Sequence, residues 1–237
     1  YMAEGNENVM ELRRWFRQTK AHNTMVLGKT AEHEETGAEN INKAAGTLLL
    51  SKDENEYQLI VTENQGYTNF KHRRAIFYVK QPQEFFVLVD EGFGTATGYA
   101  KLYFHLCDEK SVDNVLLDKE VFGAHTTFNG DNNLLVRTFG ETNKNLIFKE
   151  FDGRISYQTD RKYEQRKSYA VVMRKPDNSP VRYITVLYPV RSATGHTIKG
   201  QFKETGNKDN VSINIKIDGH PYDLNYNLNE QPIYKVR

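Results

Sequence analysis

The sequence has few of the features that mark the common enzyme and membrane-protein classes. Cys107 is the single cysteine in 237 residues, so no disulfide can form within the chain, and cysteine usage leaves the compartment open. No long apolar run occurs and the mean hydropathy is -0.71, which excludes a membrane-spanning helix. A Gly-rich phosphate loop, a paired-cysteine motif, a His-Glu-x-x-His helix and a nucleophile elbow are also missing. We therefore do not expect a self-contained enzyme of those classes.

The beginning of the chain lacks a secretion signal. Tyr1 and Met2 precede an acidic, polar stretch, without the basic and apolar regions that such a signal needs. A start on Tyr instead of Met predicts that the sequence is a piece of a longer protein.

Aromatic residues are abundant, and charge of neither sign dominates. The chain has 14 Tyr and 13 Phe, which argues for a packed core and against disorder. Its 32 Lys and Arg against 31 Asp and Glu leave a net charge of +1. The length suits one large domain or two small ones. No linker or internal repeat indicates a boundary, so a single domain over 1–237 is the simplest prediction.

Alternation of apolar and polar residues runs through most of the chain and predicts half-buried antiparallel strands. Val211 to Asp218 is the clearest case, because four β-branched residues alternate with four polar ones. Eight further stretches show the pattern: Tyr57–Thr62, Ala75–Lys80, Phe85–Asp90, Tyr99–Leu106, Leu134–Phe139, Ile147–Phe151, Tyr169–Arg174 and Val181–Val190. Turn signals lie at Asn129-Gly130, Asp152-Gly153, Pro176-Asp177-Asn178 and Asp218-Gly219.

Only two stretches have helical spacing. Glu7 to Phe16 places Val9, Leu12 and Phe16 on one face and predicts a short N-terminal helix, and Val112–Val121 suggests a short helical turn. Together these patterns predict an all-β fold, a large antiparallel β-sandwich with one short N-terminal helix.

Basic residues gather at three places although the chain is nearly neutral. Arg13, Arg14, Arg17 and Lys20 precede His22; Lys71-His72-Arg73-Arg74 form a second group; the third is Arg161–Lys167. Local positive charge is typical of a protein that binds polyanions. For the third group we favour an exposed loop and strand start. For the second, which we place where a loop meets a sheet edge, binding and simple solvation are equally supported.

The seven histidines form no local metal motif, since no two are spaced i, i+2 or i, i+4. His105 lies within an alternating strand, and we interpret it as a buried, hydrogen-bonded side chain. His22 lies between the helix and a strand start, and spacing alone leaves a structural and a ligand role open.

The segment Arg13–Thr24 resembles the start of the C-terminal β-sandwich of heparinase II/III-like polysaccharide lyases, heparinase III-like members in particular. The resemblance covers nearly the whole chain. Later stretches agree in order: His72–Lys80, Phe85–Asp90, Phe104–Leu106, Asn132–Leu135 and Thr185–Pro189.

This resemblance implies a periplasmic enzyme, a helical toroid followed by this sandwich, that cleaves heparan sulfate by β-elimination. In such chemistry a polar group neutralises the uronate carboxylate, a base removes the C5 proton and an acid protonates the departing oxygen. The family's Asn and Tyr for these steps lie on the toroid, and its catalytic His motif does not occur in these 237 residues. No catalytic residue is therefore assigned.

The resemblance also implies a metal ligand and substrate contacts. His22 matches the histidine of the family's His-Asn-Thr motif, which holds a structural divalent metal, zinc or calcium. Because zinc takes about four ligands, the others would come from outside this chain. Tyr1, His72 and Arg73 are the expected substrate-binding residues, since Arg suits bidentate sulfate recognition.

The expected partners are a sulfated glycosaminoglycan and the enzyme's own toroid, with no nucleic acid and no membrane span. Nucleic acid is disfavoured because the chain lacks net positive charge and a stacking platform. A lyase for another uronate polymer, alginate or a chondroitin, and a non-catalytic carbohydrate-binding sandwich are the alternatives.

Overall fold

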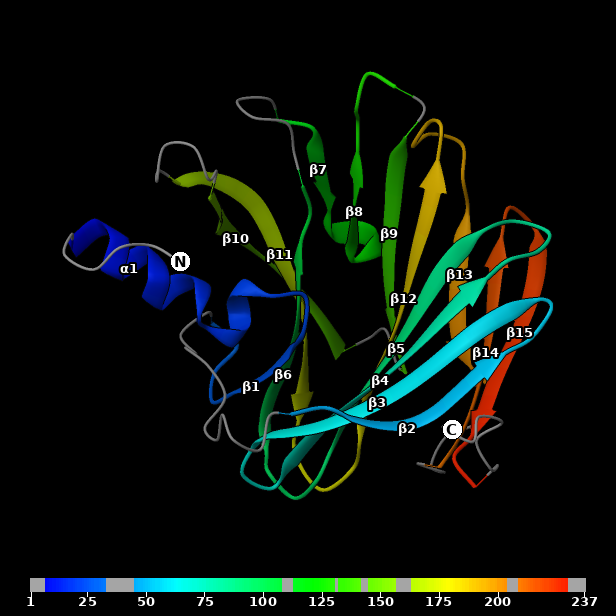
Figure 1. Cartoon of the computed structure of the whole chain (residues 1–237), viewed down its shortest axis with the longest axis horizontal. Coiled ribbons are helices and arrows are strands. Elements are labelled where there is room, and N and C mark those ends of the chain that lie inside the picture. The colour runs from blue at the N-terminus through cyan, green and yellow to red at the C-terminus, as the bar shows by residue number, and fades with distance from the viewer. Residues whose placement is uncertain are drawn as a thin grey trace, which may run out of the picture.

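The computed structural model describes residues 7–32, 45–107, 113–130, 132–141, 145–156, 163–203 and 209–229. Within these ranges the chain is built from antiparallel strands, preceded by the helix α1 (Glu7–Phe16) and the 3-10 turn η1 (Thr19–Ala21). The all-β fold with a short N-terminal helix is confirmed (Figure 1).

The strands form three antiparallel sheets. The four-stranded sheet has the order β1 (Met25–Gly28), β6 (Gly98–His105), β11 (Tyr163–Lys175), β10 (Leu146–Ser156). The eight-stranded sheet has the order β2 (Thr47–Asp53), β3 (Tyr57–Tyr67), β4 (Phe70–Val79), β5 (Phe85–Phe93), β12 (Val181–Val190), β9 (Asn133–Gly140), β8 (Gly123–Thr126), β7 (Val115–Asp118). The three-stranded sheet has the order β13 (Ile198–Phe202), β14 (Asn210–Ile217), β15 (His220–Asn227).

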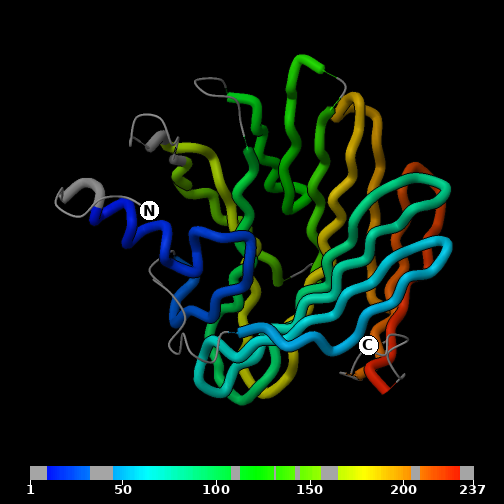
Figure 2. The backbone as a smooth tube through the Cα atoms, in the orientation of Figure 1, coloured from blue at the N-terminus to red at the C-terminus, as the bar shows by residue number. Residues whose placement is uncertain are grey.

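The eight-stranded sheet contributes to both apolar cores, because successive side chains of a strand point to opposite faces. On β5, Val87 and Val89 belong to the core shared with the three-stranded sheet, which includes Ile213 of β14. Leu88 belongs to the core shared with the four-stranded sheet, which includes Leu102 of β6. Figure 2 shows the result: the N-terminal segment and the three-stranded sheet lie at opposite sides of the molecule.

Helix α1 is anchored by one face. Leu12 is buried, and the Trp15 ring meets the rings of Phe16 and His105 edge to face, with centroids 5.0 and 6.2 Å away. Arg154 of β10 lies over the Trp15 ring, 5.5 Å from its centroid. Neither α1 nor any other helix in the described ranges is long and apolar enough to cross a membrane.

All nine predicted strands and the Glu7–Phe16 helix are present, but two local predictions are wrong. Val112–Val121 is not a helical unit: Val115–Asp118 is strand β7, the 3-10 turn η3 covers Lys119–Val121, and Val112 lies outside the described residues. Asp152-Gly153 is not a turn but lies inside β10. A Cβ on Gly153 would come within 2.1 Å of Ser168 Oγ, so this glycine serves close packing.

Candidate functional site

The basic run Lys71–Arg74 lies within strand β4, flanked by β3 and β5, and not on a loop at a sheet edge as the sequence suggested. Alternation along the strand sends Lys71 and Arg73 to one face of the sheet and His72 and Arg74 to the other. The residues Asp90 and Glu91 of β5 divide in the same way. Two separate groups of charged side chains result.

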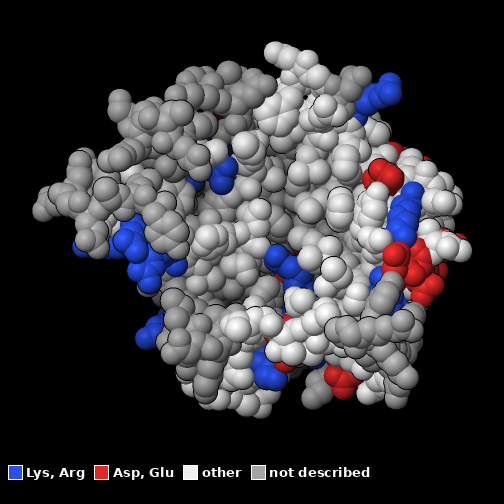
Figure 3. All heavy atoms as spheres, viewed as in Figure 1, with Lys and Arg blue, Asp and Glu red and all other residues white. Residues whose placement is uncertain are grey.

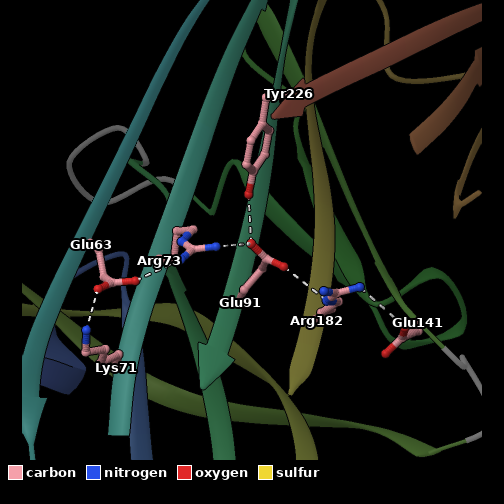
Figure 4. A network of polar contacts seen from close by, with 7 residues as sticks. All are labelled: Glu63, Lys71, Arg73, Glu91, Glu141, Arg182 and Tyr226. Atoms are coloured by element: carbon pink, nitrogen blue, oxygen red, sulfur yellow. Dashed lines mark hydrogen bonds and ion pairs between the residues drawn. The ribbon is translucent and has the colours of Figure 1, made fainter. Parts of the chain in front are cut away.

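The first group, which we call the Glu91 cluster, lies on the face toward the three-stranded sheet (Figure 4). Glu91 is fully buried, as is Arg182 of β12, whose Nε lies 3.0 Å from Glu91 Oε1. The hydroxyl of Tyr226 donates to Glu91 Oε2 at 2.7 Å and thereby joins β15 to the cluster. The remaining members are Glu63, Lys71, Arg73 and Glu141.

Arg73 connects the buried part of the Glu91 cluster to its partly exposed end. Its Nη2 donates to Glu63 Oε2 at 3.0 Å and its Nη1 lies 3.8 Å from Glu91 Oε2. Lys71, whose side chain is half exposed, completes the chain of charges with a 2.9 Å bond to Glu63. Burial raises the pKa of Glu91, and the attraction of Arg182 and the hydrogen bond from Tyr226 offset this only in part.

The second group, the Asp90 cluster, lies on the opposite face of the same two strands. Asp90 Oδ1 is 2.5 Å from His72 Nε2 and accepts from Arg74 Nε at 2.7 Å. Arg74 Nη1 also donates to the backbone oxygen of Asn23, at 2.7 Å, in the N-terminal segment. Burial opposes ionisation of Asp90, but Arg74 and His72 outweigh it, so the pKa of Asp90 lies below its ordinary value.

Asn23 links the Asp90 cluster to a buried histidine. Its Oδ1 accepts from the His105 backbone N–H at 2.7 Å. The His105 ring lies 2.8 Å from the Lys20 oxygen through Nε2 and 3.0 Å from Ser168 Oγ through Nδ1, which fits a neutral ring protonated at Nε2. Burial lowers the pKa of His105 to about 4. The interpretation of His105 as a buried, hydrogen-bonded histidine is confirmed.

The structure brings only part of the predicted site together. His72 and Arg73 are both buried but point to opposite faces, so they do not form one surface. His22 is exposed beside Asn23, next to the Asp90 cluster. Tyr1 lies outside the described residues. The substrate-binding roles of these residues stay predictions.

The described residues do not make a metal site by themselves. Among them no group of three or more His, Cys, Asp or Glu side chains has a metal-binding arrangement. His22 can supply one ligand at most, as its resemblance to the family motif implied.

Sequence reasoning missed Asp90, Glu91 and Arg182 as members of polar clusters, and it placed Arg74 in a basic run without naming it a site residue. One signal was present: Asp90-Glu91 directly follows the apolar run Phe85–Val89, where carboxylates that stay in the sheet need buried cationic partners. Their partners on the adjacent strand β4 belong to the basic run Lys71–Arg74. Arg182 and Tyr226, by contrast, come from strands far away in the sequence, and the sequence does not identify them.

An exposed apolar surface lies on the same sheet face as the Asp90 cluster. Leu48, Ile60, Ile76 and Phe86 are exposed by 62, 47, 37 and 38%. The strand register places Ile60 opposite Ile76, and Phe86 stacks on Tyr78 with 4.8 Å between centroids. Contiguous apolar side chains on a sheet face are typical of an interaction surface.

These features define a class of protein. It is an antiparallel β-sandwich in which one sheet face carries both the Asp90 cluster, bonded to the N-terminal segment, and an exposed apolar surface. The family model "Heparinase II/III-like, C-terminal" matches residues 1–220. The chain belongs to this family.

Named relatives agree with the family model. The chain is 43% identical over 230 residues to a heparin-sulfate lyase of Bacteroides thetaiotaomicron, covering 96% of this chain and 30% of that protein. Identity to a heparin-sulfate lyase of Bacteroides stercoris is 30%, with 96 and 32% covered. A crystal structure of heparinase III superposes with a TM-score of 0.80 at 40% identity, over 96% of this chain and 32% of that one. The chain thus spans about a third of the length of these relatives.

Proposed function

We propose that this chain is the C-terminal β-sandwich of a heparan sulfate lyase that cleaves its substrate by β-elimination. The observation that carries the proposal is 43% identity to a heparin-sulfate lyase along 96% of this chain. The relatives are about three times longer, which supports placing the main catalytic groups in another part of the protein.

In the proposed reaction, a base removes the proton at C5 of the uronate, the C4–O bond breaks, and an acid protonates the leaving oxygen. The carboxylate beside C5 carries developing negative charge, so a cationic or donor group there lowers the barrier. No described residue of this chain is proposed as base or acid.

The residues of this chain would position the substrate. We propose His72 and Arg73 as substrate-binding residues, with Tyr1 as a third. Arg74 is the better-placed cation on the N-terminal face, since 19% of its side chain is exposed against 7% for Arg73. Arg73 lies on the other face of the strand, where it pairs with Glu63 and Glu91, so its proposed contact with the substrate is compared with that of Arg74.

A pair of conservative substitutions in the full-length protein separates these roles. Arg74→Lys keeps the charge but loses the guanidinium fork, and we expect a KM for heparan sulfate raised about tenfold with kcat nearly unchanged. Arg73→Lys is the matched variant on the other face. An effect confined to Arg73→Lys would contradict the assignment of Arg74, and unchanged KM for both would remove this strand from substrate binding.

The activity itself is tested by incubating the full-length protein with heparan sulfate, alginate and chondroitin sulfate. The unsaturated uronate product absorbs in the ultraviolet, so its appearance with heparan sulfate alone is the expected result. Product from another polymer instead would establish a lyase of different specificity. No product from any of them would favour a non-catalytic carbohydrate-binding sandwich.

We propose that the upstream part of the full-length protein, a helical toroid, covers the apolar surface formed by Leu48, Ile60, Ile76 and Phe86. This surface shares its sheet face with the contact between Arg74 and Asn23, and the chain enters the sandwich through that segment. In the full-length protein, Ile76→Asp should accelerate proteolytic separation of the two parts. Ile147→Asp on β10, where the native side chain is 39% exposed, is the matched control. Equal cleavage of both variants would reject the surface.

We also propose that His22 ligates a structural divalent metal whose other ligands lie outside this chain, and that the protein is periplasmic. The exposed position of His22 leaves its ring accessible to such ligands. Elemental analysis of full-length His22→Ala should show the loss of about one metal equivalent relative to the unchanged protein. Full metal content in the variant would exclude His22, and recovery of the protein in the cytoplasmic fraction would exclude the compartment.

A further inference from the structure

Three exposed arginines lie on the outward side of helix α1 and at its end: Arg13 and Arg14 in the last turn, and Arg17 directly after it. The opposite face holds buried Leu12 and the half-buried rings of Trp15 and Phe16, which fix the orientation of the helix on the sandwich. Figure 3 shows basic side chains at the side of the molecule where α1 lies, whereas most acidic side chains in that view lie at the opposite side.

Among the side chains that the structure describes, these arginines differ from those of the two clusters in having no carboxylate within ion-pair distance. Glu11 on the same helix pairs instead with Arg154 of β10, at 3.1 Å. Counting only side chains that the structure describes, Arg13, Arg14 and Arg17 have no ion-pair partner. By contrast Arg73, Arg74 and Arg182 each lie within ion-pair distance of a buried carboxylate.

The spacing of the arginines produces a continuous cationic strip. Arg17 is one turn from Arg13, whose backbone oxygen accepts from the Arg17 N–H at 3.1 Å, and three residues from Arg14, so it neighbours both at about 5–6 Å along the surface. Guanidinium groups bind sulfate and carboxylate oxygens in a bidentate manner, and a rigid helix holds them at fixed separation. Successive anionic groups of an extended polymer can therefore be bound together.

We propose that this arginine strip binds a sulfated glycosaminoglycan chain as an accessory site of the sandwich. The inference rests on the proposed function, which supplies the class of polyanion. The site is distinct from the Asp90 cluster, since α1 presents its arginines away from the side chains that anchor it. Its role is to retain the polymer while the reaction occurs elsewhere in the protein.

If the three arginines have a purely structural role, the expected effect of removing them is different. Cations near a helix C-terminus stabilise the helix through its dipole. In that case the loss of the arginines would lower helix stability and leave glycan binding unchanged, so the two explanations separate in a binding measurement.

The test uses the chain as it stands, with Arg13, Arg14 and Arg17 each changed to Gln. The control changes Lys119, Lys199 and Lys216 to Gln, three exposed cations elsewhere, so both variants lose the same charge. Titration calorimetry with a heparin oligosaccharide is carried out at several NaCl concentrations. We expect at least a tenfold loss of affinity for the arginine variant, with a salt slope reduced by roughly two, and less than a threefold change for the control. Circular dichroism and thermal melting confirm that both variants are folded.

Three outcomes would overturn the inference. Equal weakening by both variants would show that only net charge matters, and unchanged binding by the arginine variant would exclude the strip. Equal affinity for a single-stranded DNA of the same charge would show that the strip has no preference for the glycan. The lyase assay on the full-length protein is independent of all three, so the proposed function can stand when the strip fails.

Discussion

The Glu91 and Asp90 clusters lie on opposite faces of the same two strands, yet they differ in what surrounds them. The Glu91 cluster is enclosed by β3, β12 and β15, and its central carboxylate has three polar neighbours. The Asp90 cluster ends at the backbone of Asn23, and Arg74 keeps partial access to solvent. Asp90 and Glu91 are adjacent on β5, but because they point to opposite faces, Glu91 belongs to an enclosed network and Asp90 to a group beside the N-terminal segment.

The largest effect is expected in the enclosed cluster. Arg182→Ala leaves the Glu91 carboxylate buried without its nearest cation, which should lower the free energy of unfolding by about 3–5 kcal/mol. Urea denaturation measures this. Lys149→Ala, which breaks the exposed pair with Glu32, is the control and should cost at most about 1 kcal/mol. A loss no greater than the control's would show that Arg73 and Tyr226 suffice for Glu91.

An intermediate effect is expected in the Asp90 cluster. Asp90→Asn removes the charge that holds His72 and Arg74, and we expect a loss of about 1.5–3 kcal/mol. The loss should be smaller than for Arg182→Ala, because Arg74 retains its bond to Asn23 and its access to water. Hydrogen exchange at the Asn23 segment should also quicken. If Asp90→Asn proves as costly as Arg182→Ala, the two clusters do not differ in the way described.

The smallest and sharpest difference should appear in the pH dependence of stability. Asp90 has a lowered pKa, so its ionisation stabilises the fold above about pH 4, and this contribution is lost as the pH falls through the folded-state pKa. Glu91 has a raised pKa, so its contribution is present at low pH and is lost as the pH rises through the folded-state pKa. The stability difference between the unchanged protein and Asp90→Asn should rise with pH below about pH 4, whereas the difference from Glu91→Gln should fall with pH above about pH 4.5. Parallel slopes would contradict the assignment.

His105, which is hydrogen-bonded to the N-terminal segment, gives a related expectation about stability at low pH. Its pKa of about 4 lies below that of an unfolded histidine, so protonation between about pH 6.5 and 4 favours the unfolded chain. His105→Gln should remove this acid sensitivity, seen as a flatter plot of melting temperature against pH over that window. The same steep fall in the variant would place the sensitivity in another group.

The strands were predictable because alternation is a local property. Val211–Asp218 shows this most clearly, since both its faces can be read directly from the sequence. The helix followed from Leu12 and Phe16 in the same way. Strand order, sheet number and packing of the three-stranded sheet depend on contacts between distant segments, and no local pattern reports them.

The site was predictable only in part, for the same physical reason. The run Lys71–Arg74 looks like a solvated edge until Glu63, Asp90, Glu91 and Arg182 are placed around it, and these residues come from three other strands. Gly153 illustrates the converse error. Asp-Gly favours a turn locally, yet Ser168 and His105 of neighbouring strands require a residue without a side chain there.

The pairing at the centre of the large sheet has a consequence for how the chain folds. Strand β5 ends at Phe93, and its neighbour β12 begins only at Val181. Six strands lie between them in the sequence, and these belong to the four-stranded sheet or to the far edge of the eight-stranded one. Closing such long loops slows folding, and domains dominated by non-local strand pairing fold in milliseconds to seconds or more slowly. During synthesis, the apolar strands β2 to β5 emerge well before the partner that covers β5. Until Val181–Val190 has left the ribosome, the edge of β5 is open to mispairing, and chaperone dependence of the nascent chain should be greatest there.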